Sequence, residues 1–454
     1  MSVAVSVMRD GRGLTLVLAA LWLLGAGVPA LEAGDLRVQL DAEAGVRNDG
    51  NAFQADPGTL EPEDESIARG GLVLKLSYTL PRTALALAYA PAYEHGLDSQ
   101  GGDGEEDLSG TSHRLELGLD SQLTRRLAMR IRERLLQTPT LDLYVPVNAP
   151  DPTAATRRGD QLSHALDVSF DQDLTRRTSL ILGAEHTLHT FESQDLSDTE
   201  TLAGRLGWSF DLTEDRSIAA IATAGQFEFE RGEADVQTFG LSYSDAWGRD
   251  GHWSIEAGAF FADSTQRRVL VVLPDASGVL PATDPETAVS EVEESDSGWR
   301  GGLQASQRLR FVNWNVGYRH DVSAGYGLGQ ATEADSLFAD VSRSFGRRLT
   351  LGLDGNASRH RDLGDLAPEP AGTGDDLLNE FAAGTARFSW NILQDLRLTG
   401  GYSYIWQESE VEPFEDLSYS RYFLGLGFRI FSFGDTPNEP DLQGEPTDEE
   451  PDAD

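Results

Sequence analysis

The chain has 454 residues, 75 acidic against 36 basic side chains, a formal charge of −39, 47 glycines and no cysteine. The lack of cysteine excludes disulfides, thiolate metal ligands and a lipid-modified cysteine anchor. The acidic balance argues against a nucleic-acid partner, because phosphate binding requires a basic surface.

The first thirty residues have the layout of a signal peptide. Arg9 and Arg12 precede an apolar run at 14–24, which is too short to span a bilayer as a helix. Val28 and Ala30 supply small residues at positions −3 and −1, so we expect cleavage after Ala30. No later stretch approaches 18 apolar residues, so we expect no transmembrane helix. Residues 1–30 are therefore predicted to be a signal peptide and 31–433 a single folded domain.

From residue 35 onward, apolar and polar side chains alternate with a period of two. Leu115, Leu117 and Leu119, for example, are separated by Glu116 and Gly118. Because successive side chains of a β-strand point to opposite faces, each such segment has one apolar and one polar wall. The predicted strands are 35–47, 71–80, 83–93, 113–123, 127–135, 161–174, 178–189, 200–212, 217–230, 236–246, 252–262, 298–308, 311–320, 336–345, 349–359, 381–391, 396–406 and 419–431. This gives eighteen strands, or sixteen if 217–230 and 236–246 are not strands.

Three features favour a barrel in lipid over a soluble β-sandwich. The segments run to about 9–12 residues, which is the length of a tilted membrane strand. Short connections such as 123–127, 174–178 and 212–216 alternate with long acidic ones, and aromatic residues lie near strand ends. The predicted fold is an all-β, single transmembrane antiparallel up-and-down β-barrel with both termini in the periplasm.

The last predicted strand has a distinctive pattern. Tyr422, Leu424, Leu426, Phe428 and Ile430 alternate along it, and Gly425 lies between them. This resembles the C-terminal strand signal of Gram-negative outer-membrane β-barrels, with Gly425, Phe428 and Ile430 as its assembly signal. The resemblance implies location in the cell outer membrane, insertion by the barrel-assembly machinery, and lipid and lipopolysaccharide as neighbours. The repeated Leu-Thr-Arg-Arg turns are similar to those of β-barrel porins of extracellular-polysaccharide loci.

The chain departs from this signal by continuing past the last aromatic position. Residues 434–454 contain no Lys or Arg, four Pro and no apolar periodicity. We therefore predict a disordered acidic C-terminal tail.

Many charged side chains fall on the polar wall, which is predicted to face the lumen. An arginine on the lipid face costs about 2–4 kcal/mol at the bilayer midplane, so the lumen is the favoured place. The basic lumen candidates are Arg114, Arg130, Arg132, Arg134, Arg205, Arg300, Arg308, Arg319, Arg387, Arg397, Arg421 and Arg429. The acidic ones are Glu116, Asp120, Asp167, Glu185, Glu256 and Asp354. These groups form either an anion pathway or a ladder of ion pairs that stiffens the wall.

Arg130, Arg132 and Arg134 are three consecutive inward positions on one strand. Like charges so close require a counter-ion, and Glu116 and Asp120 on the preceding strand are the candidates.

The remaining acidic groups concentrate in the long connections. They form either a solvated surface or sites for divalent cations that bridge lipopolysaccharide. The longest connection, 263–297, contains an apolar run at 269–273 and is a candidate to fold inward as a constriction or lid.

No catalytic site is predicted. His186 and His189 are three apart on a strand, so they face opposite sides and do not share a metal ion. Neither a nucleophile elbow nor a His-Glu-x-x-His motif occurs. We therefore expect no enzyme activity, no metal site and no cofactor.

The predicted function is passive passage of hydrophilic solutes, with anionic ones as one possibility, through an outer-membrane channel. Two alternatives stay open: export of an anionic extracellular polysaccharide, and a plugged structural or adhesive barrel.

Overall fold

The computed structural model describes residues 34–53, 63–97, 109–138, 161–191, 197–230, 232–248, 250–271, 287–323, 331–362, 377–409 and 417–434. The predicted signal peptide and the tail beyond residue 434 lie outside these residues. No helix in the described ranges is long and apolar enough to cross a bilayer.

The described residues form eighteen β-strands. They are β1 (Asp35–Phe53), β2 (Glu63–Leu80), β3 (Thr83–Gly96), β4 (Gly110–Thr124), β5 (Leu127–Thr138), β6 (Gln161–Asp173), β7 (Thr178–Phe191), β8 (Thr199–Asp211), β9 (Arg216–Phe229), β10 (Gly232–Trp247), β11 (Gly251–Val271), β12 (Thr287–Arg308), β13 (Val312–Ser323), β14 (Thr332–Phe345), β15 (Leu349–Asp362), β16 (Leu377–Asn391), β17 (Leu396–Ser409) and β18 (Leu417–Phe433). Each of the eighteen predicted segments coincides with one of them, and β9 and β10 cover the two weakest predictions.

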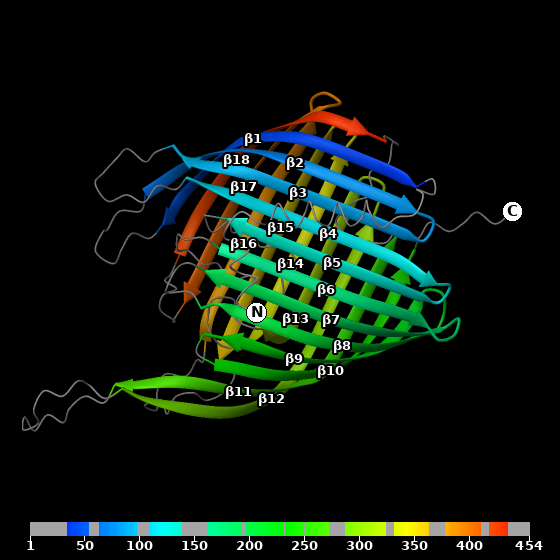
Figure 1. Ribbon diagram of the computed structural model, residues 1–454, viewed down its shortest axis with the longest axis vertical. Coiled ribbons are helices and arrows are strands. Elements are labelled where there is room, and N and C mark those ends of the chain that lie inside the picture. Colours follow the sequence, from blue (N-terminus) through cyan, green and yellow to red (C-terminus); the bar gives the residue numbers. More distant parts are fainter. Residues whose placement is uncertain are drawn as a thin grey trace, which may run out of the picture.

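Each strand pairs antiparallel with the next in sequence, and β1 pairs antiparallel with β18, so the sheet closes (Figure 1). Ala42 of β1, for example, lies opposite Leu72 of β2 and opposite Phe428 of β18. Every described strand therefore has two hydrogen-bonding neighbours, which a sheet surrounded by lipid requires. The predicted fold, a closed antiparallel up-and-down barrel of eighteen strands, is confirmed.

The short turns gather at one end of the barrel, on the right in Figure 1. Val38 pairs with Phe433 at this end, so the first and last strands begin and finish there. We call it the short-turn end, and the opposite end the long-connection end.

Several short turns contain the same hydrogen bond from a backbone N–H to a threonine hydroxyl, which explains why the sequence Leu-Thr recurs in them. The Thr124 hydroxyl accepts a hydrogen bond from the Arg126 backbone N–H at 3.2 Å. Thr175 does the same for Arg177 at 3.2 Å, and Thr213 for Asp215 at 3.3 Å. A threonine that bonds the backbone two residues on stabilises a turn locally, which fixes the register of the hairpin that follows.

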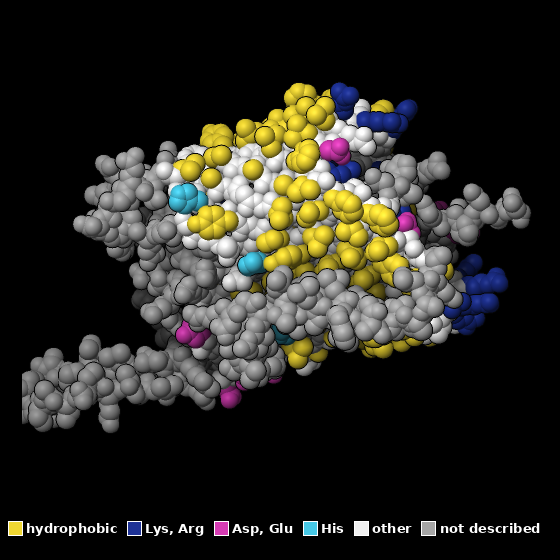
Figure 2. All heavy atoms as spheres, turned by 45° about the horizontal axis from the view of Figure 1, so that its top comes forward, with side chains coloured by type: hydrophobic (Ala, Val, Ile, Leu, Met, Phe, Trp, Pro, Cys, Tyr) yellow, Lys and Arg dark blue, Asp and Glu magenta, His cyan; other side chains and the backbone are white. Residues whose placement is uncertain are grey.

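The outer wall of the barrel is a broad apolar surface. Leu182, Leu202, Leu206, Phe239 and Leu241 are each at least half exposed, and Figure 2 shows hydrophobic side chains covering much of the visible outside. Lys and Arg side chains gather at the short-turn end instead (Figure 2). An exposed apolar band of this extent requires a non-aqueous cover.

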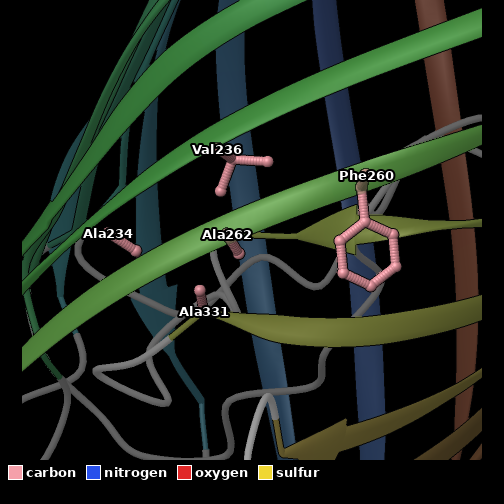
Figure 3. Packing of buried hydrophobic residues seen from close by; sticks show 5 residues of the cluster. All are labelled: Ala234, Val236, Phe260, Ala262 and Ala331. Atoms are coloured by element: carbon pink, nitrogen blue, oxygen red, sulfur yellow. The ribbon is translucent and has the colours of Figure 1, made fainter. Parts of the chain in front are cut away.

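One small apolar cluster lies on the inner wall at the long-connection end. It consists of Ala234, Val236, Phe260, Ala262 and Ala331, all buried (Figure 3). Other buried apolar side chains of the inner wall, such as Phe381 and Ile405, lie outside this cluster, so the cluster is a local patch rather than a continuous core.

The predicted long loop at 263–297 is wrong for most of its length. The β11–β12 ladder continues from Asp263, opposite Ser295, to Val271, opposite Thr287. This hairpin extends past the ends of its neighbours in Figure 1, so its described part continues the wall and does not fold inward. Valine and threonine on both sides favour extended backbone, and this propensity outweighs the acidic composition. Residues 272–286 lie outside the described part.

Strands β10 and β11 approach each other closely at Gly258 of β11, and a substitution there tests this. A Cβ at this position would overlap the carbonyl oxygen of Phe239 on β10. We expect Gly258→Ala to lower the yield of folded, heat-modifiable barrel several-fold, measured by electrophoretic mobility with and without boiling. Gly384→Ala is the matched control, because a Cβ there meets nothing within 4 Å. Equal yields for both variants would contradict the argument.

Candidate functional site

The charged positions predicted for the lumen share the wall opposite to the exposed apolar side chains. On β4, Arg114, Glu116 and Asp120 alternate with Leu115, Leu117 and Leu119. On β18, Arg421 and Arg429 alternate with the exposed Tyr422, Leu424, Leu426, Phe428 and Ile430. The same parity places the remaining candidates on the inner wall: Arg130, Arg132, Arg134, Asp167, Glu185, Arg205, Glu256, Arg300, Arg308, Arg319, Asp354, Arg387 and Arg397.

Three arginines of β5 face two carboxylates of β4. Arg132 donates through Nη2 to both oxygens of Asp120, at 2.9 and 2.8 Å. Arg130 Nε lies 3.9 Å from Asp120 and Arg134 Nε lies 3.8 Å from Glu116. The arginine side chains are 47–60% exposed. One arginine is therefore held tightly, and the other two keep most of their donors available to the lumen.

A shallow cavity of about 180 Å³ follows on the next strands. Its lining is Arg130, Ser169, Asp171, Ile181, Arg205, Gly207 and Ile221. Arg205 Nη2 lies 3.7 Å from Asp167, which is itself directly opposite Glu185 on β7. Here basic, acidic and apolar side chains meet on one accessible part of the inner wall.

Arg300 occupies a different kind of site. Its side chain is only 8% exposed, and Nη2 contacts Glu256 at 3.0 Å and Asp321 at 3.1 Å. Nη1 donates to the Thr238 hydroxyl at 2.6 Å. These contacts join β10, β11, β12 and β13 across the wall. Arg300 is therefore a structural cross-link and offers little to a solute.

Arg387 makes a similar cross-link over β14, β15 and β16. It contacts Asp340 at 3.2 Å and Asp354 at 3.3 Å. Arg319 pairs with Asp321 at 2.9 Å, and Arg397 donates to the side chain of Asn391 at 3.2 Å. Arg300 and Arg387 thus cross-link strands of the wall, whereas Arg130 and Arg134 on β5 and Arg205 on β8 remain about half exposed.

Accessibility of the inner wall changes along the barrel. Half-exposed charges such as Arg134 lie in its middle part. Towards the long-connection end, the inward positions of His360 and Gln407 are 0% exposed, and Glu94, Phe260 and Phe381 are also buried. The described wall is therefore open to solvent in the charged zone and covered near that end.

The outer wall carries a polar row that sequence reasoning missed. Glu133, His164, His186 and Glu200 lie on four adjacent strands, β5 to β8. His164 contacts Glu133 at 3.2 Å, His186 contacts Glu200 at 2.9 Å, and the two imidazole centroids are 5.8 Å apart. The only sequence signal is Glu133 at an outward position between Ile131 and Leu135. Its partners are distant in sequence, so the row follows from the register of the ladders.

A second outer cluster surrounds His320 near the long-connection end. Its ring contacts Asp335 at 2.9 Å and Glu333 at 3.0 Å and stacks on Trp299 at a centroid distance of 3.9 Å. Among the described residues, no group of three or more His, Asp or Glu is placed to hold a metal ion.

Comparison with known proteins finds no matching family model and no matching curated protein. The search of solved structures returns porins at low similarity. A BenF-like porin from Pseudomonas fluorescens is 11% identical, with a TM-score of 0.42 over 88% of this chain and all of that one. Pseudomonas aeruginosa OccK2, in complex with glucuronate, is 11% identical, and OpdK with vanillate is 12% identical. Each gives a TM-score of 0.41 over 88% of this chain and 99% of the other. At these values, the barrel assignment rests on the strand order and closure of this chain.

The burial of Arg300 leads to a stability prediction. Arg300→Ala leaves Glu256 without its cation and Asp321 with Arg319 alone, and breaking a buried ion pair costs about 3–5 kcal/mol. We expect the midpoint of urea unfolding in lipid vesicles to fall accordingly. Arg134→Ala, which removes an exposed arginine, is the control and should cost under about 1 kcal/mol. Equal losses for the two variants would show that Arg300 is not a cross-link.

Proposed function

We propose that this chain is an outer-membrane channel for passive passage of hydrophilic solutes, with a preference for anionic ones. The observation that carries the proposal is the exposed arginine group on the inner wall. Within the described part of the chain, the carboxylates that Arg130, Arg134 and Arg205 contact lie at 3.9, 3.8 and 3.7 Å. Arginines that line a pore with unused donors attract anions.

The outer-membrane location is part of this proposal. A closed sheet with an apolar outer wall and a charged inner wall is the arrangement that strands adopt in a bilayer. In single-chain barrels of this kind, short turns and both termini face the periplasm. We extend this to the short-turn end here, with the assembly machinery reading Gly425, Phe428 and Ile430 and lipopolysaccharide contacting the opposite rim.

Carboxylates on the neighbouring strands limit how strong the anion preference can be. Asp167, Asp171 and Glu185 follow the arginine row across β6 and β7. The wall is therefore polarised around the lumen, with a basic sector on β5 and an acidic sector beside it. Such a pore admits hydrophilic solutes of both signs, and its preference depends on which sector the solute contacts.

A second candidate is a barrel that is closed at rest, either a plugged structural barrel or a polysaccharide exporter opened by a partner. The burial of His360, Gln407 and Phe381 on the inner wall near the long-connection end favours it. Folded, inserted protein without conductance would support this candidate against the first.

The decisive experiment is single-channel recording of the refolded protein in a planar bilayer, with the reversal potential measured in a salt gradient. Stable channels with anion preference are the expected result. Cation preference would overturn the anionic part of the proposal and leave passage of hydrophilic solutes standing.

The β5 arginines should set the preference. We expect replacement of Arg130, Arg132 and Arg134 by Ser to shift the reversal potential towards cation selectivity. A control with the same change in net charge replaces Arg343, Arg359 and Arg361 by Ser, because these three project from the outer wall. If the control shifts the potential equally, or the β5 variant leaves it unchanged, the arginine row does not line the pathway.

A further inference from the structure

The cavity on the inner wall of β5 to β9, which we call the inner hollow, is lined by side chains of three chemical kinds. Its volume is about 180 Å³, and its lining is basic, acidic and apolar in turn: Arg130, Ser169, Asp171, Ile181, Arg205, Gly207 and Ile221. Pockets that bind small molecules combine apolar surface with a few polar groups in fixed places. The inner hollow therefore has the composition of a site for one small solute.

The polar part of the inner hollow is a row that crosses the strands. Ser169 of β6 lies directly opposite Arg130 of β5 and Gly183 of β7, and Gly183 lies opposite Arg205 of β8. Because Gly183 has no side chain, the guanidinium group of Arg205 lies over it. A Cβ at Gly183 would be only 3.3 Å from Nε and Nη2 of Arg205. Two arginines thus border this row with a serine between them, and such donors bind a carboxylate.

A second row, two residues nearer the short-turn end, contains an apolar gap. Gly207 of β8 lies directly opposite Ile181 of β7 and Ile221 of β9. A Cβ at Gly207 would lie 3.4 Å from Cβ of Ile181 and 3.9 Å from Cγ1 of Ile221, which are ordinary contact distances. The glycine therefore leaves a space between two isoleucines that a branched aliphatic group can fill, and burying such a group is favourable.

A carboxylate lies at the β6 side of this apolar row. Asp171 is directly opposite Ile181, and it is separated from Ser169 by one residue along β6. Within the described part of the chain, the buried Oδ1 atom of Asp171 has no hydrogen-bond partner. A buried acceptor without a donor is costly. An ammonium group in the inner hollow would therefore gain a favourable contact with Asp171, beside the place where the arginines bind a carboxylate.

The charges around the inner hollow favour a solute that carries both signs. Arg130 and Arg205 lie 3.9 and 3.7 Å from Asp120 and Asp167, so their charges are already partly balanced. A simple anion would meet Asp171 as a like charge, and a simple cation would meet two arginines. A zwitterion presents each of its charges to a group of opposite sign.

We propose that the inner hollow is a binding site for a zwitterionic amino acid with a branched aliphatic side chain, such as leucine. The carboxylate of the amino acid contacts Arg130, Arg205 and the Ser169 hydroxyl. Its ammonium group contacts Asp171, and its side chain fills the gap at Gly207. This inference rests on the proposed passage of hydrophilic solutes, and it names the class of solute that binds on the way.

The test measures binding rather than conductance. Saturation-transfer NMR on the refolded protein in deuterated detergent gives the Kd of L-leucine and of three analogues that each lack one part. The analogue 4-methylpentanoate lacks the ammonium group, 3-methylbutylamine lacks the carboxylate, and glycine lacks the side chain. We expect leucine to bind at least fivefold more tightly than each of them, because only leucine contacts all three parts of the inner hollow.

Two variants assign the parts of the solute to their partners. Asp171→Asn removes only the contact with the ammonium group, so the Kd of leucine should rise at least fivefold while that of 4-methylpentanoate does not rise. Gly207→Val fills the apolar gap, so the Kd of leucine should rise at least fivefold while that of glycine stays the same.

Each variant has a matched control. Asp211→Asn makes the same charge change at an exposed inward position of β8, outside the lining of the inner hollow. Gly427→Val adds the same side chain to the inner wall at β18, where a Cβ meets nothing within 4 Å. Both controls should bind leucine as the wild type does, and heat-modifiability verifies that all variants are folded.

The outcomes separate this inference from the proposed function. Equal affinity of the wild type for leucine and 4-methylpentanoate, or equal losses in the site and control variants, would overturn the binding site even if the barrel conducts ions. Selective leucine binding by a folded barrel without conductance would support the binding site and overturn the proposed passage alone.

Discussion

Register between paired strands is the constraint on which the rest of this barrel depends. Side chains alternate between walls, so a slip of one residue in any ladder would exchange the inner and outer faces of a strand. The pairing of Ala42 with both Leu72 and Phe428 keeps apolar residues outward across the closure. Arg300 and Arg387 reinforce this register, since each of them joins carboxylates on two other strands. These contacts exist only in one register.

The same register gives two different roles to inward arginines that look alike in the sequence. Arg132, Arg300 and Arg387 each bond carboxylates at 3.3 Å or less, and they hold the wall together. Arg130, Arg134 and Arg205 lie farther from their nearest acidic partners and remain about half exposed. Arginines that cross-link the wall and arginines that we propose to line a solute pathway therefore share one wall and occupy different parts of it.

The sequence alone predicts the strands well because their signals are local. Period-two alternation and turns such as Leu174-Thr175 need only a few neighbouring residues, so all eighteen strands were identifiable, including β9 and β10. The β11–β12 extension was missed, since acidic composition at 291–296 resembles a loop until its partner strand is known. The pairing of Arg300 with Thr238 and Asp321, and of His164 with Glu133, spans many residues. Only the three-dimensional register brings such groups together.

The closing contact between β1 and β18 also affects the rate at which the barrel forms. All other ladders join strands that follow each other along the chain, so each hairpin closes at a small entropic cost. The β1–β18 ladder joins residues separated by nearly the whole domain, such as Val38 and Phe433. Contacts of such long range are slow to form. Until they do, the unpaired backbone of the first and last strands would be exposed to lipid at a high cost. Closure is therefore the step at which assistance during insertion has the greatest effect, and both strands involved begin or finish at the short-turn end.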